Sequence, residues 1–304
     1  MKKKDIIQER LFMLSFKNIE LSDREILESF FEKFGYPVSD NCFGGLYIWQ
    51  PGFQSQYAVI EETVILRGKD GGRWVYQCPI GKNVKAAAEF LINTRQPDLL
   101  FVGLCPAEKA FLERNFEGKF KFINNRDSSE YVYSREALCS FSGKNYQQKR
   151  NHVNKFLRLY GQPETVILNG ENISLISETE HLWINGHDGE DIRIIHENAA
   201  FRRAVENFDE LGFMGAAIRV EGKTVAFGIG EKLSEDTVIE HFEKADREMD
   251  GCYAVMVQQF ARILPPEIKY INREEDMGIE GLRKSKLSLK PVFMEEKYDG
   301  IYIG

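Results

Sequence analysis

The sequence twice predicts the same succession of secondary-structure elements, and this succession limits the fold more than any other feature of the chain. Each half predicts a helix, a hairpin, a strand, a helix, a strand, a helix and a strand, although the residues of the two halves are not similar. A hairpin that leads into alternating strands and helices indicates a mixed sheet with helices on both faces. With 304 residues and about 150 residues per domain as a guide, we expect two domains of this α/β (α+β) kind.

The predicted elements are spread evenly over the two halves. In the first half we expect helices at 23–34, 84–94 and after Pro106, and extended segments at 45–49, 57–67, 73–78, 99–104, 119–123 and 130–134. In the second half we expect helices near 201–211, 251–263 and 278–289, and strands at 213–220, 224–231, 237–242, 268–272 and 291–298. A basic helix at 144–158 joins the halves.

This order of elements is also that of the GNAT acyltransferase fold, in which the central strands splay and leave a gap for an acyl donor. Other α/β folds could host the same order, so the order alone does not decide between them. We expect two domains, each a mixed, largely antiparallel sheet with helices on both faces. Their expected bounds are 1–141 and 161–304, with the connecting helix within 142–160.

Composition excludes several classes of protein. Lys and Arg number 40 against 47 Asp and Glu, so the net charge of −7 argues against coating nucleic acid by bulk charge. No apolar run approaches the ~18 residues that a membrane span needs, and the five cysteines form no CxxC pair. We expect free thiols, no integral membrane segment and a cytoplasmic location. The polar stretch 181–191 contains two histidines, but its spacing matches no metal-site pattern, so we predict a turn and no metal.

Two predicted helices carry cations inside their apolar faces. Lys149 and Arg150 lie in the apolar sector of the helix at 144–158, and Arg283 and Lys286 lie within or beside that of the helix near 278–289. A buried cation needs a partner. Either these side chains pair with internal carboxylates, or they line a cleft and bind an anionic substrate.

The strand at 237–242 and the helix after it contain the best local candidates for catalysis. His241 and Glu243 are candidate bases, and Tyr253 is a candidate proton donor late in the reaction. Arg247 and Gly251 are candidates for binding an anionic cofactor group at the helix N-terminus. The intervening segment lacks the paired glycines usual in acyl-CoA enzymes, which favours a donor other than CoA. An ordinary polar strand end is the alternative explanation.

The segments SGKNYQQKRNHVNKF (142–156) and INREEDMGIEGLRKSKLS (271–288) resemble the C-terminal domain of phosphatidylglycerol lysyltransferases, a family that includes soluble proteins. The resemblance implies tandem GNAT-like domains and transfer of an aminoacyl group from aminoacyl-tRNA. The matching positions are Lys149, Arg150, Asn151, Arg273, Glu275, Asp276, Gly278, Gly281, Arg283, Lys284 and Lys286. Of these, the resemblance adds Asn151, Arg273 and Asp276 to the expected substrate-binding residues.

Our leading hypothesis is an aminoacyl- or acyltransferase that takes its group from aminoacyl-tRNA and gives it to a small-molecule, peptide or lipid acceptor without a cofactor. One alternative is an N-acyltransferase that uses acetyl-CoA or another acyl-CoA. Another is a non-catalytic binding protein that retains the cleft.

Overall fold

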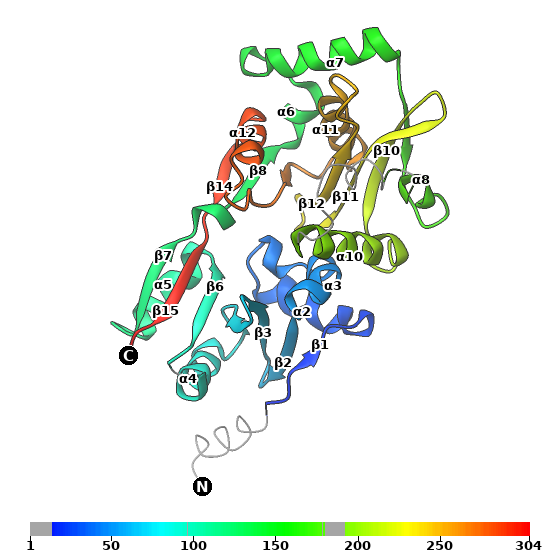
Figure 1. The fold of residues 1–304 in the computed structure, drawn as a ribbon. Helices are drawn as coiled ribbons and strands as arrows, with labels where there is room; N and C mark the ends of the chain where they lie inside the picture. The colour runs from blue at the N-terminus through cyan, green and yellow to red at the C-terminus, as the bar shows by residue number, and fades with distance from the viewer. Residues whose placement is uncertain (1–13, 96, 178, 180–191) are drawn as a thin grey trace. The chain divides into compact units, whose positions relative to one another are not determined.

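The computed structural model describes residues 14–95, 97–177, 179 and 192–304, and it separates into two compact units (Figure 1). The first unit extends to Ser129 and resumes with Glu295–Gly304, and the second comprises Glu130–Met294. Each unit contains one mixed, largely antiparallel sheet, which confirms the predicted GNAT-like class. The stretch 181–191, predicted to be a turn, lies outside the described residues.

This division differs from the predicted boundaries at 141/142 and 160/161. Strand β8 (Glu130–Ser134), expected in the first half, pairs with β13 (Tyr270–Asn272) in the second sheet. Strand β15 (Tyr298–Tyr302), at the end of the second half, pairs with β6 (Leu100–Leu104) and β7 (Phe120–Asn124) in the first sheet. Each half therefore supplies a strand to the other unit's sheet. Strand pairing joins distant segments, so local periodicity does not predict it.

The first unit is built on a sheet whose C-terminal strand returns from the end of the chain. Lys297, directly before β15, is 1% exposed, and its ammonium donates to Asp40, which anchors the returning strand. The sheet order is β1 (Lys17–Asn18), β2 (Gln56–Ile60), β3 (Thr63–Asp70), β4 (Arg73–Tyr76), β6, β15 and β7, with β5 (Ile80–Gly81) beside β3. The helices are α2 (Arg24–Phe34), α3 (Phe43–Phe53), α4 (Val84–Arg95) and α5 (Pro106–Asn115).

The prediction of an extended segment at 45–49 is wrong, because these residues form the middle of α3. This helix is apolar on every side, so it lacks the 3.6-residue alternation of polar and apolar residues by which surface helices are recognised. Phe43 and Ile48 are buried in the first unit. A short apolar run of this kind is read equally well as a buried strand, and only packing decides between the two.

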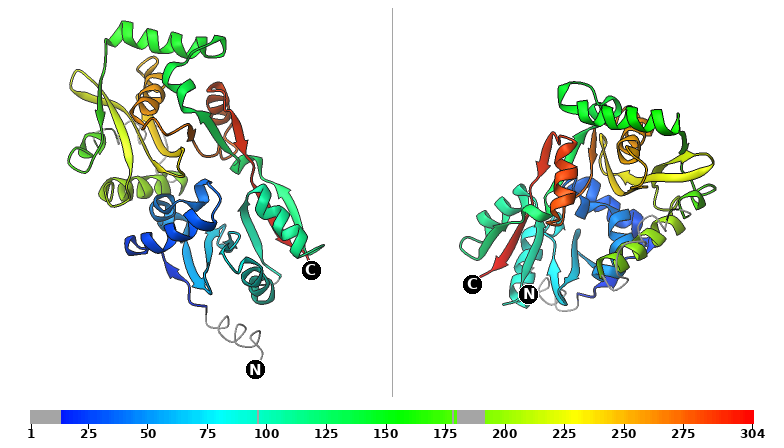
Figure 2. Two further views of the ribbon diagram at one scale, coloured as in Figure 1. Left: turned by 180° about the vertical axis from the view of Figure 1, so that it is seen from behind. Right: turned by 45° about the horizontal axis from the view of Figure 1, so that its top comes forward.

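In the second unit, helices cover both faces of the sheet (Figures 1 and 2). Helix α10 (Ile192–Glu206) packs on one face, where Phe201 contacts Phe227. Helix α11 (Cys252–Ile263) packs on the other, beneath α6 (Arg135–Ser140) and α7 (Gln147–Tyr160). The sheet order is β14 (Phe293–Glu295), β8, β13, β12 (Thr237–Ala245), β11 (Lys223–Lys232), β10 (Met214–Val220) and β9 (Glu164–Ile167); α8 (Ser174–Ser177) and α12 (Glu280–Ser288) complete the unit.

The central strands β12 and β13 of the second unit separate after a short parallel pairing. Their register joins Thr237 to Tyr270 and ends at the pair Ile239 and Asn272. Strand β12 then continues to Ala245, whereas β13 ends at Asn272, and the two residues after it form backbone hydrogen bonds with Tyr131 of β8 and none with β12. The splayed strands expected of a GNAT-like domain are therefore present, and they separate beside Glu240.

A β-bulge in β12 decides which side chains face the gap between the two strands. Phe242 pairs with Ile229, but the next pair joins Glu240 to Gly230, so His241 is an additional residue in β12. Without it, Glu240 and Glu243 would point to opposite faces, because strand side chains alternate. With the bulge, both glutamates point to the α11 face.

Gly251 directly precedes α11, and the close packing of α7 on α11 requires a glycine at this position. Its φ of 86° is left-handed, and a Cβ there would lie 2.2 Å from the carbonyl oxygen of His152 on α7. The absence of a side chain thus lets α7 lie directly over the start of α11. Gly281 in α12 provides a contrast, since nothing lies within 4 Å of a Cβ built there.

We expect Gly251→Ala to lower the free energy of unfolding by more than about 2 kcal/mol, because strain at positive φ adds to the clash with α7. Gly281→Ala is the matched control and should raise it by up to about 1 kcal/mol through helix propensity. Urea denaturation of both variants measures the two effects. Equal midpoints for the two variants would contradict this role for Gly251.

Candidate functional site

Two glutamates of β12 meet one arginine where the central strands of the second unit separate. Arg273 follows β13, and its Nε lies 2.5 Å from Oε2 of Glu240. Its Nη2 lies 2.9 Å from Oε2 of Glu243. The side chains of Glu240, Glu243 and Arg273 are only 3%, 8% and 12% exposed. We call these three residues the splay cluster.

The splay cluster holds more potential negative than positive charge. Burial raises the pKa of Glu240 to about 8, with Arg273 opposing and Glu243 adding to the rise. Burial acts to lower the pKa of Arg273, but the two carboxyl groups outweigh it and raise that pKa. At neutral pH, Glu240 therefore holds a proton while it contacts Arg273. The one positive charge of Arg273 is then balanced by the one negative charge of Glu243.

Glu240 occupies space left free by a glycine on the neighbouring strand. A Cβ at Gly228 would lie 3.0 Å from Oε1 of Glu240 and 3.1 Å from Cδ2 of Phe260. That Oε1 is buried and has no hydrogen-bond partner among the described residues. Because Oε2 accepts from Arg273, the proton of Glu240 is on Oε1, and a buried hydroxyl without an acceptor is costly, which suits a place where a water or a substrate acceptor is bound.

Lys149 and Tyr253, both predicted from the sequence, lie near the splay cluster. Lys149 on α7 is half-buried. Burial is the largest cause that lowers its pKa, and the positive charge of Arg273 lowers that pKa further. Its ammonium has no hydrogen bond or ion pair with any described residue. Tyr253 on α11 is 39% exposed. Its partial burial raises its pKa, and the negative charge of Glu243 raises it further. A hydrogen bond with Arg247 acts in the opposite direction.

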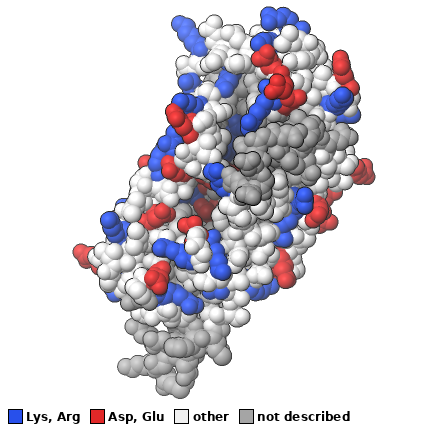
Figure 3. Space-filling model, in the orientation of Figure 1, with Lys and Arg blue, Asp and Glu red and all other residues white. Residues whose placement is uncertain are grey.

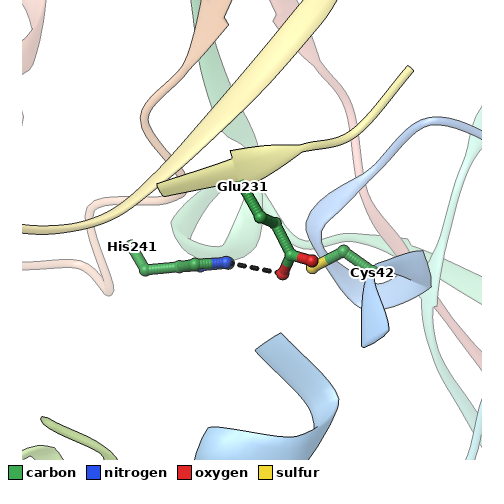
Figure 4. Close-up of side chains that lie close together, drawn as sticks. All are labelled: Cys42, Glu231 and His241. Carbon is green, nitrogen blue, oxygen red and sulfur yellow. Dashed lines mark hydrogen bonds and ion pairs between the residues drawn. The ribbon is translucent and has the colours of Figure 1, made fainter. Parts of the chain in front are cut away.

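His241 points away from the cluster, towards the face of the sheet that carries α10. Its Nε2 lies 2.8 Å from Oε1 of Glu231 (Figure 4), and its Nδ1 lies 2.8 Å from Oε1 of Glu274. Two carboxylate acceptors are satisfied together when the imidazolium donates from both nitrogens. The structure therefore separates His241 from Glu243, and the ring has no unengaged nitrogen with which to act as a base.

Asp276 and Arg283 pair with each other. Asp276 is fully buried and accepts hydrogen bonds from Arg283 through Nε at 2.8 Å and Nη2 at 2.7 Å. The Tyr131 hydroxyl and the Gly278 amide donate to the same carboxylate, at 2.5 and 2.9 Å. Although burial opposes it, these donors hold the pKa of Asp276 well below its usual range. Internal pairing accounts for this part of the predicted substrate site.

Lys286 and Arg150 bind backbone oxygens, and Asn151 lies in solvent. Lys286 donates to the carbonyl of Arg273, and its ammonium lies 5.8 Å from the centre of the Tyr131 ring. Arg150 donates to the carbonyl oxygens of Phe141 and Gly143. Asn151 is exposed on α7. Neither Arg150 nor Asn151 contacts the splay cluster among the interactions of the described residues.

The turn between β12 and α11, predicted to bind an anionic cofactor group, is acidic. Asp246 accepts a hydrogen bond from the Glu248 amide at 2.9 Å, and Asp250 pairs with Lys155 on α7 at 2.7 Å. Arg247 is exposed there. The structure thus gives Gly251 a packing role and fills part of the turn with carboxylates.

Sequence reasoning missed Glu240 and Gly228. Glu240 is three residues before Glu243, a spacing that places the two on opposite faces of a regular strand. A glutamate directly after the apolar residues Val238 and Ile239 was the available signal, but only the bulge explains it.

Among the described helices, none is both long and apolar enough to cross a membrane.

Comparison with known proteins identifies relatives of the whole fold. The family profile described as "Phosphatidylglycerol lysyltransferase, C-terminal" matches residues 31–299. A crystal structure of a conserved protein of unknown function from Bacteroides thetaiotaomicron is 35% identical, with a TM-score of 0.88, and the match covers 96% of this chain and 100% of that one.

Two further matches are more distant. The C-terminal domain of a protein described as a lysylphosphatidylglycerol synthetase from Agrobacterium fabrum shares the fold at 14% identity and a TM-score of 0.63, over 93% of this chain and 92% of that domain. An uncharacterised protein from Mycoplasmoides gallisepticum is 27% identical over 180 residues. That match covers 58% of this chain and 57% of the relative, just over half its length.

We expect Arg283→Ala to lower the free energy of unfolding by about 3 kcal/mol, because it leaves the carboxylate of Asp276 buried without its cation. The adjacent Lys284→Ala is the control. Lys284 pairs with Glu280 in solvent, with both side chains at least 74% exposed, so its removal should change stability by less than about 0.5 kcal/mol. Chemical denaturation compares the two, and similar small losses would rule out a structural role for Arg283.

The raised pKa of Glu240 predicts a pH dependence of stability. Between its ordinary value near 4.5 and about 8, the folded protein holds a proton that the unfolded chain releases, so stability should fall as pH rises through this interval. Glu240→Gln keeps the shape of the side chain and removes this titration. The melting temperature of the native protein should therefore decline relative to that of the variant from pH 5 to pH 8. Parallel curves would contradict a raised pKa.

Proposed function

Because the chain belongs to the phosphatidylglycerol lysyltransferase C-terminal family, we propose that it transfers an aminoacyl group from aminoacyl-tRNA to a hydroxyl or amine acceptor at the splay cluster. The observation that carries the proposal is the buried pair Glu240 and Glu243, both placed by the bulge of β12 beside Arg273. Buried titratable groups with shifted pKa values, gathered where two strands separate, are typical of functional sites.

The reaction sets clear requirements. The acceptor oxygen or nitrogen forms a bond to the acyl carbon, and the ester bond from that carbon to the ribose oxygen of the tRNA breaks. The acceptor loses a proton, the ribose oxygen gains one, and a negative charge develops on the acyl oxygen in between. A base, a proton donor and a cation near one another meet these needs.

The residues around the cluster can fill these three roles. Glu243 takes the acceptor proton, and Arg273 positions its carboxylate. Tyr253 is protonated at neutral pH, as a tyrosine ordinarily is, so it donates to the ribose oxygen and regains a proton from Glu243. The ammonium of Lys149, which no described residue binds, stabilises the charge on the acyl oxygen or binds a donor phosphate.

The acidic turn before α11 supports a tRNA donor over CoA. In CoA-dependent enzymes of this fold, the amides at this turn bind a pyrophosphate. Here Asp246 already accepts from the Glu248 amide, and two further acids stand in the same turn. Like charges would repel a pyrophosphate at this place.

The proposal is tested with tRNA charged with a labelled amino-acid mixture and hydroxylamine as a small surrogate acceptor. We expect the native protein to accelerate formation of the labelled hydroxamate above the rate without protein. Glu243→Gln should reduce this acceleration by about 10² or more, the usual contribution of a general base. Glu197→Gln is the control, because Glu197 pairs with Lys244 on the α10 face and should leave the rate unchanged.

Binding measured in the same samples separates catalysis from mere binding. Affinity for aminoacyl-tRNA should be similar in the native protein and Glu243→Gln and should fall steeply with salt. Binding without any acceleration would favour a non-catalytic binding protein, and absence of binding would refute the tRNA donor. Stabilisation by millimolar acetyl-CoA would instead favour the CoA-dependent alternative.

A further inference from the structure

A cavity of about 260 Å³ lies between α7 and α11 in the second unit, away from the splay cluster. Its walls follow helical spacing: α7 contributes the face that runs from Arg150 to Leu157, and α11 the face from Val255 to Arg262. Ser140, at the end of α6, also lines it. We call it the α7–α11 cavity. Figure 3 shows Lys and Arg side chains along the top of the view, where α7 lies.

The α7–α11 cavity carries two positive charges and no acidic lining residue. Arg150 donates through Nη1 to the carbonyl oxygens of Phe141 and Gly143, and Arg262 donates through Nε to the Cys139 carbonyl at 3.0 Å. These carbonyls fix the guanidinium groups but do not neutralise them. Among the described residues, neither arginine forms an ion pair with a carboxylate.

An amide of α11 opens into the same cavity. Gln258 lines it and is only 6% exposed as a residue, and its side-chain amide, which keeps some contact with solvent, has no hydrogen-bond partner among the described residues. An amide without a protein partner at the wall of a cavity is suited to a polar ligand. Three further amides, of Asn154, Gln162 and Gln259, line the cavity and add donors.

The remaining wall is apolar. Val153, Leu157 and Val255 contribute it, and Val153 and Val255 are buried. A bare anion would leave this wall against water, whereas a ligand with a short hydrocarbon part would cover it. The cavity is slightly smaller than the usual pockets for drug-sized molecules, which limits the ligand to a small one.

We propose that the α7–α11 cavity binds a small organic phosphate, with the phosphate between Arg150 and Arg262, its oxygens near the Gln258 amide, and its hydrocarbon part against Val153 and Val255. A phosphate monoester is largely dianionic at neutral pH, which matches two guanidinium groups that have no carboxylate partner. This binding site is independent of the proposed transfer reaction, so the two proposals are tested separately.

The experiment measures thermal stabilisation of the full chain by n-butyl phosphate, inorganic phosphate and n-butanol at constant ionic strength. We expect saturable stabilisation by both phosphates, with n-butyl phosphate binding at least threefold more tightly, and none by n-butanol. Arg262→Gln should weaken n-butyl phosphate at least tenfold. Arg158→Gln is the matched control, because Arg158 of α7 is an exposed arginine like Arg262 but does not line the cavity.

A second variant separates loss of binding from loss of folding. Gln258→Met keeps the size of the side chain and both arginines but removes the amide, and we expect it to weaken n-butyl phosphate about tenfold with an unchanged melting temperature in buffer. Equal weakening by Arg158→Gln, no saturable stabilisation by either phosphate, or binding of n-butyl phosphate no tighter than inorganic phosphate would each overturn the proposal.

Discussion

The second unit depends on one guanidinium group shared by two buried carboxyl groups. Arg273 contacts both Glu240 and Glu243 where water has little access. Two ionised carboxylates with one cation would leave a buried negative charge, so Glu240 retains its proton to about pH 8. Removing Arg273 would leave both glutamates without a cation, whereas the arginine itself cannot give up its charge. The bulge and the separation of the strands bring the three groups together, and protonation of Glu240 lets the two carboxyl groups share one positive charge.

The four residues after β13 fill the opening between the strands with charges directed to different sides. Arg273 contacts the α11 face of β12, Glu274 reaches His241 on the α10 face, and Asp276 binds Arg283 of α12. Such a network is a poor source of stability, because the cost of desolvation takes up most of the Coulomb attraction. Within it, the pair of Asp276 and Arg283 is structural, whereas Arg273 with its two glutamates is the part that fits the proposed reaction.

The sequence predicted most elements because most of them carry a strong local period, as α7 and the β10–β11 hairpin do. It failed where packing or pairing over long distances decides the structure. Helix α3 is apolar on every side, so its period was lost. The exchange of β8 and β15 between the sheets depends on partners more than 100 residues away. For the same reason the sequence predicted only part of the site. Glu243 was predicted as a candidate base, but only the bulge at His241 places Glu240 on the same face of the sheet.

Lys149 and Arg150 are neighbouring cations on the apolar face of α7, but the fold gives them different roles. Successive residues of a helix point about 100° apart, so Lys149 and Arg150 cannot face the same neighbour. Arg150 turns towards α6, where carbonyl oxygens of the loop that follows it fix its guanidinium beside the α7–α11 cavity. Lys149 turns towards the charges of Arg273 and Glu243 and finds no partner among the described residues. A cation on an apolar helix face thus indicates function only where the fold provides no carboxylate partner for it. By this criterion Lys149 is a better candidate for a substrate-binding residue than Arg283, which pairs with Asp276.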